Sequence, residues 1–224
     1  MPRSPRPRDA ATLILLRHGE GEPQVLLGQR HAKHAFMPNR YVFPGGRVDR
    51  HDHLVRPASH LRPEVKTRLE RAATPSRAKA LAIAAVRETY EETGLMLGAP
   101  LVRGARPPGT GATWDAFTEN GMGPALDVLD YVFRAVTPPK RPRRFNARFF
   151  VADAKHAVGE LRGDGELVDL KWVGLREALT LPIPQVTHLV LEMVGEQIKR
   201  PPADGDRPVP RFQTIHGRFV FDEE

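Results

Sequence analysis

Three glutamates near the middle of the chain have a spacing that suits a metal site on a helix. Glu88, Glu91 and Glu92 stand three and four residues apart, so on an α-helix their carboxylates share one side of a single turn. Like charges at this spacing cost about 0.2–0.5 kcal/mol per pair, and acids in the last turn cost about 0.3–1 kcal/mol each against the helix dipole. A bound divalent cation would remove both penalties. Mg²⁺ and Mn²⁺ are the candidates, because hard ions prefer carboxylate oxygens and also accept phosphate oxygens from a substrate.

This pattern has a catalytic and a structural interpretation. In the first, the metal neutralises a diphosphate and positions a water molecule, and one carboxylate accepts the proton of that water. In the second, the glutamates form a solvated acidic helix face with Arg87 as their counterion. The spacing of the three glutamates leaves both interpretations open.

The element that would carry these glutamates is a helix over 76–93. This segment contains no Pro or Gly and is rich in Ala, Leu, Arg and Glu. Thr74 and Pro75 are start signals, and Gly94 is a stop signal. The acidic groups are therefore expected in the last turns of the helix.

A second element, the loop Pro44-Gly45-Gly46, follows a short strand at Val42-Phe43. Proline and paired glycines end a strand and let another group approach the backbone closely.

The remaining pattern predicts an α/β layered domain with a partly antiparallel sheet, because strands and helices do not alternate strictly. Two strands at 12–16 and 24–27 form a hairpin, and a stripe of apolar residues predicts a helix at 184–199 that packs on the sheet. The segment 103–124 is predicted as a loop with a short helix at 114–119. Other predicted strands cover 128–136, 147–152 and 167–173, and a short helix covers 63–71.

The composition limits the classes of function. The 224 residues fit one domain, the chain has no cysteine, and no apolar run is long enough to span a bilayer. Thiolate ligands and disulfides are therefore excluded, and a cytoplasmic location is the default expectation. The net charge of +7 would suit a polyanion. Arginine outnumbers lysine and Ala, Pro and Gly are abundant, which coding bias also explains, so we do not expect a nucleic-acid partner.

The segments RETYEETGL and FPGGRVDRHD resemble the two halves of the Nudix box. Gly46 fits the opening glycine of the box, and Asp52 occupies the position of its first glutamate. About 27 extra residues separate the halves, compared with the usual spacing. Two departures are Asp52, which is one methylene shorter than glutamate, and Thr89, which replaces an aliphatic residue. The second half matches at Arg87, Glu88, Glu91, Glu92, Gly94 and Leu95.

The resemblance implies a Nudix-like α/β/α sandwich with a mixed sheet and metal-dependent hydrolysis of a diphosphate linkage. It implies that Glu88 and Glu92 bind Mg²⁺ or Mn²⁺, that Glu91 assists, and that Arg87 orients the carboxylates. A backbone carbonyl of the glycine loop, assigned to Gly45, is a further ligand. The shorter Asp52 would reach the metal through water. Such sites often gain an acid from elsewhere, and among Glu160, Asp164 and Glu166 we favour Glu166.

The flanks LLGQRHAKHAFMPNRYVFPGG and AVTPPKRPRRFNARFFVA resemble the Nudix branch that contains acyl-CoA diphosphatases, which also has a split box. CoA or a CoA ester is therefore a candidate substrate among nucleoside diphosphate derivatives. The CoA-associated signature expects an arginine near Ala35 and a glycine near Asn39, and this chain has neither. The residues expected to contact the substrate are Arg30, Arg40 and Arg144, together with the insert 53–75, Arg141 and Arg143.

The predicted organisation is a flexible tail at 1–9, a hydrolase domain at 10–200 with the insert 53–75, and a C-terminal extension at 201–224 that can form a hairpin. The partner is a small nucleotide diphosphate rather than a membrane. Self-association as a homodimer stays open.

Two rival functions are kept. The segment RHGE, with Arg17 and His18, resembles the opening motif of histidine phosphatases, although no second histidine motif follows. A non-catalytic Nudix-like module could instead bind nucleotide or RNA through RPRRFNARFF. His31 and His34 are too few for a metal site of their own, since the chain offers no third ligand at a suitable spacing.

Overall fold

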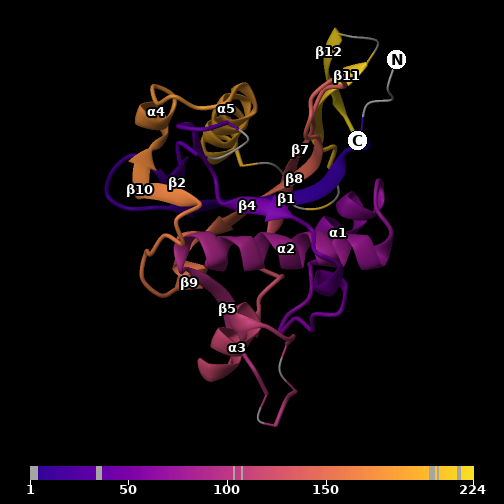
Figure 1. Ribbon diagram of the computed structural model, residues 1–224, viewed down its shortest axis with the longest axis vertical. Coiled ribbons are helices and arrows are strands. Elements are labelled where there is room, and N and C mark those ends of the chain that lie inside the picture. The colour runs from indigo at the N-terminus through magenta and orange to yellow at the C-terminus, as the bar shows by residue number, and fades with distance from the viewer. Residues whose placement is uncertain are drawn as a thin grey trace.

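A nine-stranded mixed sheet forms the centre of the protein in the computed structural model, which describes residues 5–33, 37–102, 104–106, 108–201, 205, 207–215 and 218–224 (Figure 1). The order along the sheet is β10, β2, β1, β8, β7, β11 and β12, with β3 beside β2 and β4 beside β1. β1 pairs parallel with β8, whereas β1 with β2 and β7 with β8 pair antiparallel. The strands are β1 (Arg8–Arg17), β2 (Gln24–Arg30), β3 (Tyr41–Val42), β4 (Gly45–Arg47), β7 (Asp130–Val136), β8 (Phe145–Asp153), β10 (Leu167–Gly174), β11 (Pro210–Ile215) and β12 (Arg218–Glu223).

Helices cover both faces of this sheet (Figure 1). Along β1, Leu13 and Leu15 pack into the core on the side of α2, whereas Ile14 and Leu16 pack into the core on the side of α5. This alternation is the period-two pattern of a strand that is buried on both faces. The predicted α/β/α architecture with a mixed sheet is confirmed. The helices are α1 (Pro63–Glu70), α2 (Pro75–Thr93), α3 (Ala112–Glu119), α4 (Leu175–Ala178) and α5 (Gln185–Lys199).

Helix α2 begins and ends where its cap residues predict. The side chain of Thr74 accepts a hydrogen bond from the backbone N–H of Arg77, which satisfies a free donor of the first turn. Gly94 ends the helix with a φ of 74°. A Cβ at Gly94 would lie 2.6 Å from the carbonyl oxygen of Glu160, so the position requires glycine.

A second, small sheet lies on the side of α2 away from the main sheet (Figure 1). It consists of β6 (Met122–Pro124), β5 (Met96–Pro100) and β9 (Ala157–Val158), in that order. Leu97, Trp114 and Phe117 from this layer join the same hydrophobic cluster as α2. The short helix predicted at 114–119 is present as α3, whereas β6, in the same segment, was not predicted. Paired glycines were expected to end a strand, yet Gly45-Gly46 themselves form β4 on β1.

The insert packs against the main sheet, and the first and last strands of the described chain, β1 and β12, belong to that sheet. α1 lies in the insert, and its Arg68 side chain is 1% exposed and donates to the carbonyl of Tyr131 at 2.9 Å. β1 begins at Arg8, inside the segment predicted as a tail. The C-terminal hairpin β11–β12 adds to the sheet, because β11 pairs parallel with β7. None of the helices in the described part of the chain has the length and apolar character of a membrane span.

Candidate active site

The glycine strand β4 lies directly against the last turns of α2. A Cβ on Gly46 would lie 2.4 Å from Oε2 of Glu88, so the carboxylate occupies the space of the missing side chain. A Cβ on Gly45 would lie 2.5 Å from the carbonyl oxygen of Ala11 on β1. The backbone N–H of Gly45 also donates to Oε2 of Glu92 at 2.7 Å. Two glycines are required here because both neighbours approach the backbone too closely for any side chain.

Arg87 connects the acidic groups of the site. Its Nη1 donates to Oε1 of Glu88 and to Oε2 of Glu91, each at 2.8 Å. Its Nε and Nη2 donate to the two carboxylate oxygens of Asp52 at 2.9 and 3.1 Å. Nη2 also donates to the carbonyl of Arg47 at 2.9 Å. One guanidinium therefore fixes the end of α2 against β4 and the following turn, in the fork geometry that arginine provides.

Asp52 is 1% exposed, and both of its oxygens accept hydrogen bonds from Arg87. Oδ2 also accepts from the backbone N–H of Asp49 at 2.7 Å, which forms part of a capping box around the turn 50–53. This placement favours a role in holding Arg87. Contact with a metal would require Asp52 to give up a buried ion pair.

Glu92 is buried, at 3% exposed, and the Glu88 side chain is 17% exposed; both face the glycine strand. Burial, with smaller contributions from the charges of Glu91 and Glu166, raises the pKa of Glu88 to about 7, although Arg87 lowers it. Burial raises the pKa of Glu92 well above its usual range, although the Gly45 N–H stabilises its charge, and the charges of Glu88 and Glu166 add to the rise. Both side chains would therefore gain from a nearby cation.

Glu91 is held by a residue that sequence reasoning missed. The hydroxyl of Thr113 on α3 donates to Oε1 of Glu91 at 2.6 Å, while Arg87 holds the other oxygen. Thr113 lies in the Gly- and Pro-rich segment that was predicted as a loop, so no sequence signal linked it to the glutamates. Both oxygens of Glu91 are engaged by protein donors, which distinguishes it from Glu88 and Glu92.

The loop that precedes β10 crosses the C-terminal end of α2. Glu166 was selected from the sequence on the expectation that its loop would lie over this helix. The backbone N–H of Arg162 donates to the carbonyl of Thr93 at 2.9 Å, and the Arg162 side chain bonds the Tyr90 hydroxyl. Glu166 lies 3.5 Å from the guanidinium of Arg30. Its charge also acts on Glu88 and Glu92, as their pKa values show. Arg30 and Glu166 therefore belong to the same group as the helix glutamates.

The other two acids of this loop stand apart from the glutamate group. Asp164 accepts a hydrogen bond from the backbone N–H of Glu166 at 2.8 Å, so it supports the turn. The carbonyl oxygen of Glu160 lies over Gly94.

Other residues selected from the sequence lie elsewhere. The guanidinium of Arg144 donates to the carbonyls of Thr137 and Pro5, which ties the N-terminal segment to the β7–β8 hairpin. Arg40 is exposed, and its carbonyl accepts from the N–H of Arg30. Arg17 stacks on the Trp172 ring at 4.5 Å and bonds Gln24. His34 and Ala35 lie outside the described residues.

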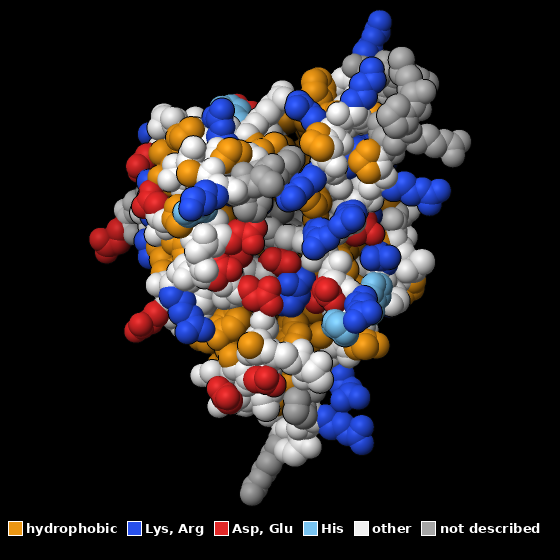
Figure 2. All heavy atoms as spheres, viewed as in Figure 1, with side chains coloured by type: hydrophobic (Ala, Val, Ile, Leu, Met, Phe, Trp, Pro, Cys, Tyr) orange, Lys and Arg blue, Asp and Glu red, His pale blue; other side chains and the backbone are white. Residues whose placement is uncertain are grey.

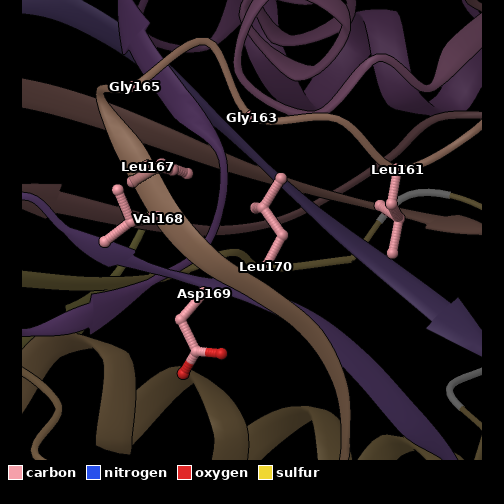
Figure 3. A pocket seen from close by; sticks show the side chains of 7 residues that line it. All are labelled: Leu161, Gly163, Gly165, Leu167, Val168, Asp169 and Leu170. Atoms are coloured by element: carbon pink, nitrogen blue, oxygen red, sulfur yellow. The ribbon is translucent and has the colours of Figure 1, made fainter.

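Acidic side chains gather at the centre of one face of the molecule, with basic side chains around them (Figure 2). Two shallow hollows border the loop that carries Glu166. One is lined by Leu161, Gly163, Gly165 and the segment 167–170, whose side chains point in several directions (Figure 3). The other is lined by His31, Lys33, Gly165 and Glu166. The second hollow lies beside a carboxylate of the site and offers two basic groups to an anionic ligand.

The donor set fits a divalent ion that keeps water and substrate oxygens in its shell. Within the described residues, no three acidic or histidine side chains converge closely enough to enclose an ion on their own. Mg²⁺ needs no such cage, because one or two carboxylates with waters and phosphates commonly complete its octahedron. Glu88 and Glu92 provide two hard, buried carboxylates beside one strand.

Comparison with solved structures relates this arrangement to known proteins. A NUDIX hydrolase from Alicyclobacillus acidocaldarius is 28% identical, with a TM-score of 0.63 over 84% of this chain and 90% of that chain. The NUDIX domain of Shewanella oneidensis NrtR, solved with ADP ribose, is 14% identical, with a TM-score of 0.50 over 87% of this chain and 90% of that chain. Neither the protein-family models nor the curated proteins give a match. The chain therefore has the Nudix fold and is similar in sequence and structure to a hydrolase with that fold.

Proposed function

We propose that this protein is a metal-dependent hydrolase that cleaves a diphosphate linkage in a nucleoside diphosphate joined to another group. The observation that carries the proposal is the pair of buried carboxylates, Glu88 and Glu92, packed on the strand Gly45-Gly46. Burial of acids with raised pKa values is costly for a protein and is typical of functional sites. The similarity to Nudix hydrolases supports the same chemistry.

In this proposal Glu88 and Glu92 hold Mg²⁺ or Mn²⁺, with the carbonyl of Gly45 as a further ligand. The bound ion would neutralise the diphosphate and make a water molecule more acidic. Arg87 keeps Glu88 and Glu91 in place, and Asp52 keeps Arg87 in place. These buried contacts hold the carboxylates in position before the substrate binds, so less reorganisation is needed during the reaction.

The substrate side of the proposal places phosphate near Arg30 and the hollow that contains His31 and Lys33. Arg30 is close enough to Glu92 to lower the pKa of that acid, so its charge acts where the diphosphate would lie. Glu166, which lies near Glu88 and Glu92, is the proposed additional metal ligand. CoA and its esters are the first substrates to test, followed by NADH, ADP-ribose and dinucleoside polyphosphates.

The placement of Arg17 weakens the histidine-phosphatase alternative. Its guanidinium stacks on Trp172 and bonds Gln24, instead of facing a phosphate pocket with His18. The non-catalytic alternative keeps the fold but lacks turnover, so only an activity measurement separates it from the hydrolase.

The decisive experiment assays these diphosphates with Mg²⁺ or Mn²⁺ and identifies the products. The expected result is release of a nucleoside monophosphate or phosphorylated fragment that stops on addition of EDTA. Glu92→Gln should reduce turnover at least 100-fold while the circular dichroism spectrum stays unchanged, since the carboxylate charge is lost without a change in shape. Glu196→Gln, on an exposed part of α5, is the matched control and should keep full activity. Equal turnover for Glu92→Gln and Glu196→Gln would exclude this site as the catalytic centre.

A further inference from the structure

The last strand of the main sheet, β12, has an open outer edge. β12 ends the sheet and pairs with β11, and no other strand in the described ranges pairs with it (Figure 1). Its sequence from Arg218 to Glu223, RFVFDE, contains no proline, glycine or lysine. Natural edge strands are usually protected by proline, by charged side chains, by bulges or by a covering element. β12 has no proline and no bulge in its pairing with β11, so its protection rests on the charges of Arg218, Asp222 and Glu223, and it can accept a strand that matches those charges.

The exposed side chains of β12 are apolar as well. Phe219 is 61% exposed and Phe221 is 59% exposed. They share the face of the sheet on which Phe219 stacks with Phe212 and Phe221 contacts Phe133. Two adjacent exposed phenylalanines on an open edge are typical of an interaction surface.

The hydrogen-bond pattern identifies which backbone groups point outward. Val209 and Glu224 exchange both of their backbone hydrogen bonds at 3.0 Å, and the register between β11 and β12 runs from there to Ile215 opposite Arg218 without a shift. Hydrogen-bonded pairs alternate along an antiparallel ladder. Residues 218, 220 and 222 therefore bond to β11, while the N–H and C=O groups of 219, 221 and 223 point away from it.

We infer that the partner of this edge is a second copy of the same strand, joined antiparallel to form a two-fold dimer with a continuous sheet. The two-fold axis of such a dimer is perpendicular to the sheet, so the side chains of two paired residues lie on the same face. Because side chains alternate between the faces along a strand, the residue numbers of each pair must add up to an even number. The register centred on Val220 brings Phe219 opposite Phe221 of the second copy. These two positions carry the outward backbone groups, so they form hydrogen-bonded pairs on both sides of the axis.

The same register matches charges. Arg218 lies opposite Asp222 of the second copy in a non-hydrogen-bonded pair, where side chains approach most closely. A register shifted by two residues would instead place Phe219 opposite Glu223 and Val220 opposite Asp222. The register centred on Val220 is therefore the self-complementary one. Because a single strand pair buries less than a standard interface, the dimer should be reversible and depend on concentration.

A cysteine scan tests the register, since the chain has no cysteine of its own. In Val220→Cys the two sulfurs meet at the axis, where the Cα atoms are about 4.5 Å apart, within the range of a disulfide. Phe219→Cys and Phe221→Cys place the thiols two residues out of register. Val102→Cys, at a residue that is 82% exposed, reports random collisions. Under mild oxidation Val220→Cys should form a covalent dimer at least 10-fold faster than the other three, as seen on a non-reducing gel.

Sedimentation velocity of the unmodified protein from 5 to about 500 μM gives an independent test, with the dimer expected to increase across this range. Phe221→Pro removes an outward N–H without affecting the ladder to β11 and should keep the protein monomeric, whereas Phe221→Ala keeps that donor and should weaken the dimer less. A monomer at every concentration would overturn the proposal. A cross-linking rate at position 220 no higher than at 102, or a higher rate at 219 or 221, would also overturn it.

Discussion

Glu88 should make the metal-free protein less stable as the pH rises. Burial raises the pKa of Glu88 from 4.5 to about 7. Each pKa unit corresponds to about 1.36 kcal/mol, so ionising Glu88 in the folded state costs about 3 kcal/mol relative to the unfolded chain. The folded protein keeps this proton while the unfolded chain releases it. The free energy of unfolding should therefore fall between about pH 4.5 and 7 and level off above that window.

Glu88→Gln removes this titration. Its free energy of unfolding, relative to that of the unmodified protein, should be about 3 kcal/mol higher at pH 8 than at pH 4. Any constant loss from the Arg87 hydrogen bond cancels in this difference. Urea denaturation in EDTA at intervals from pH 4 to 8 measures it. Glu196→Gln is the control, because Glu196 is exposed and its hydrogen bond with Lys199 lowers its pKa.

Parallel pH curves for the unmodified protein and Glu88→Gln would refute this reasoning. They would show that the carboxyl is solvated in solution and does not lie against Gly46. Addition of Mg²⁺ gives a second readout, since an ion bound by ionised Glu88 should restore stability above pH 7 in the unmodified protein more than in Glu88→Gln.

Three further substitutions test the surroundings of the site. Asp52→Ala removes the most deeply buried of the three carboxylates that Arg87 bonds, while Glu88 and Glu91 remain, and should lower the free energy of unfolding by about 1–3 kcal/mol, measured by urea denaturation. Gly46→Ala places a Cβ 2.4 Å from Oε2 of Glu88; the displaced carboxylate should lower kcat about 100-fold with an unchanged circular dichroism spectrum. Arg144 was expected to contact the substrate, but its guanidinium bonds backbone carbonyls, so Arg144→Glu should lower stability by about 1–3 kcal/mol and leave KM within twofold of that of the unmodified protein.

The sequence predicted the elements whose signals are local. Helix α2 has its cap residues within one turn of each end, and β1 alternates its buried side chains between two cores, so both were placed within a few residues of their bounds. The small sheet was not predicted. Its strands are two to five residues long, and β5 finds one partner at β9, some sixty residues later. Pairing over such distances leaves no periodic pattern in either segment.

The residues of the candidate site also differ in how far the sequence could predict that they come together. Glu88, Glu91 and Glu92 come together through helical geometry alone, so their spacing was sufficient to group them. Thr113 reaches Glu91 from a helix in a Gly- and Pro-rich segment. Arg30 and Glu166 meet because β2 and β10 are neighbours. These contacts depend on sheet order, which a single sequence does not display.

The contact between Asp52 and Arg87 explains how the two halves of the box can be so far apart in the sequence. Lengthening a flexible connection from seven residues to 34 costs only about 1–1.5 kcal/mol in loop-closure entropy. The insert also contributes contacts of its own, because the buried Arg68 bonds Asp130 and the carbonyl of Tyr131. Lys79 on α2 in turn donates to the carbonyl of Val55. These hydrogen bonds between the insert, the sheet and α2 offset the added entropy of the connection. The geometry of the site therefore depends on which groups meet at Arg87, while the number of residues between them is free to vary.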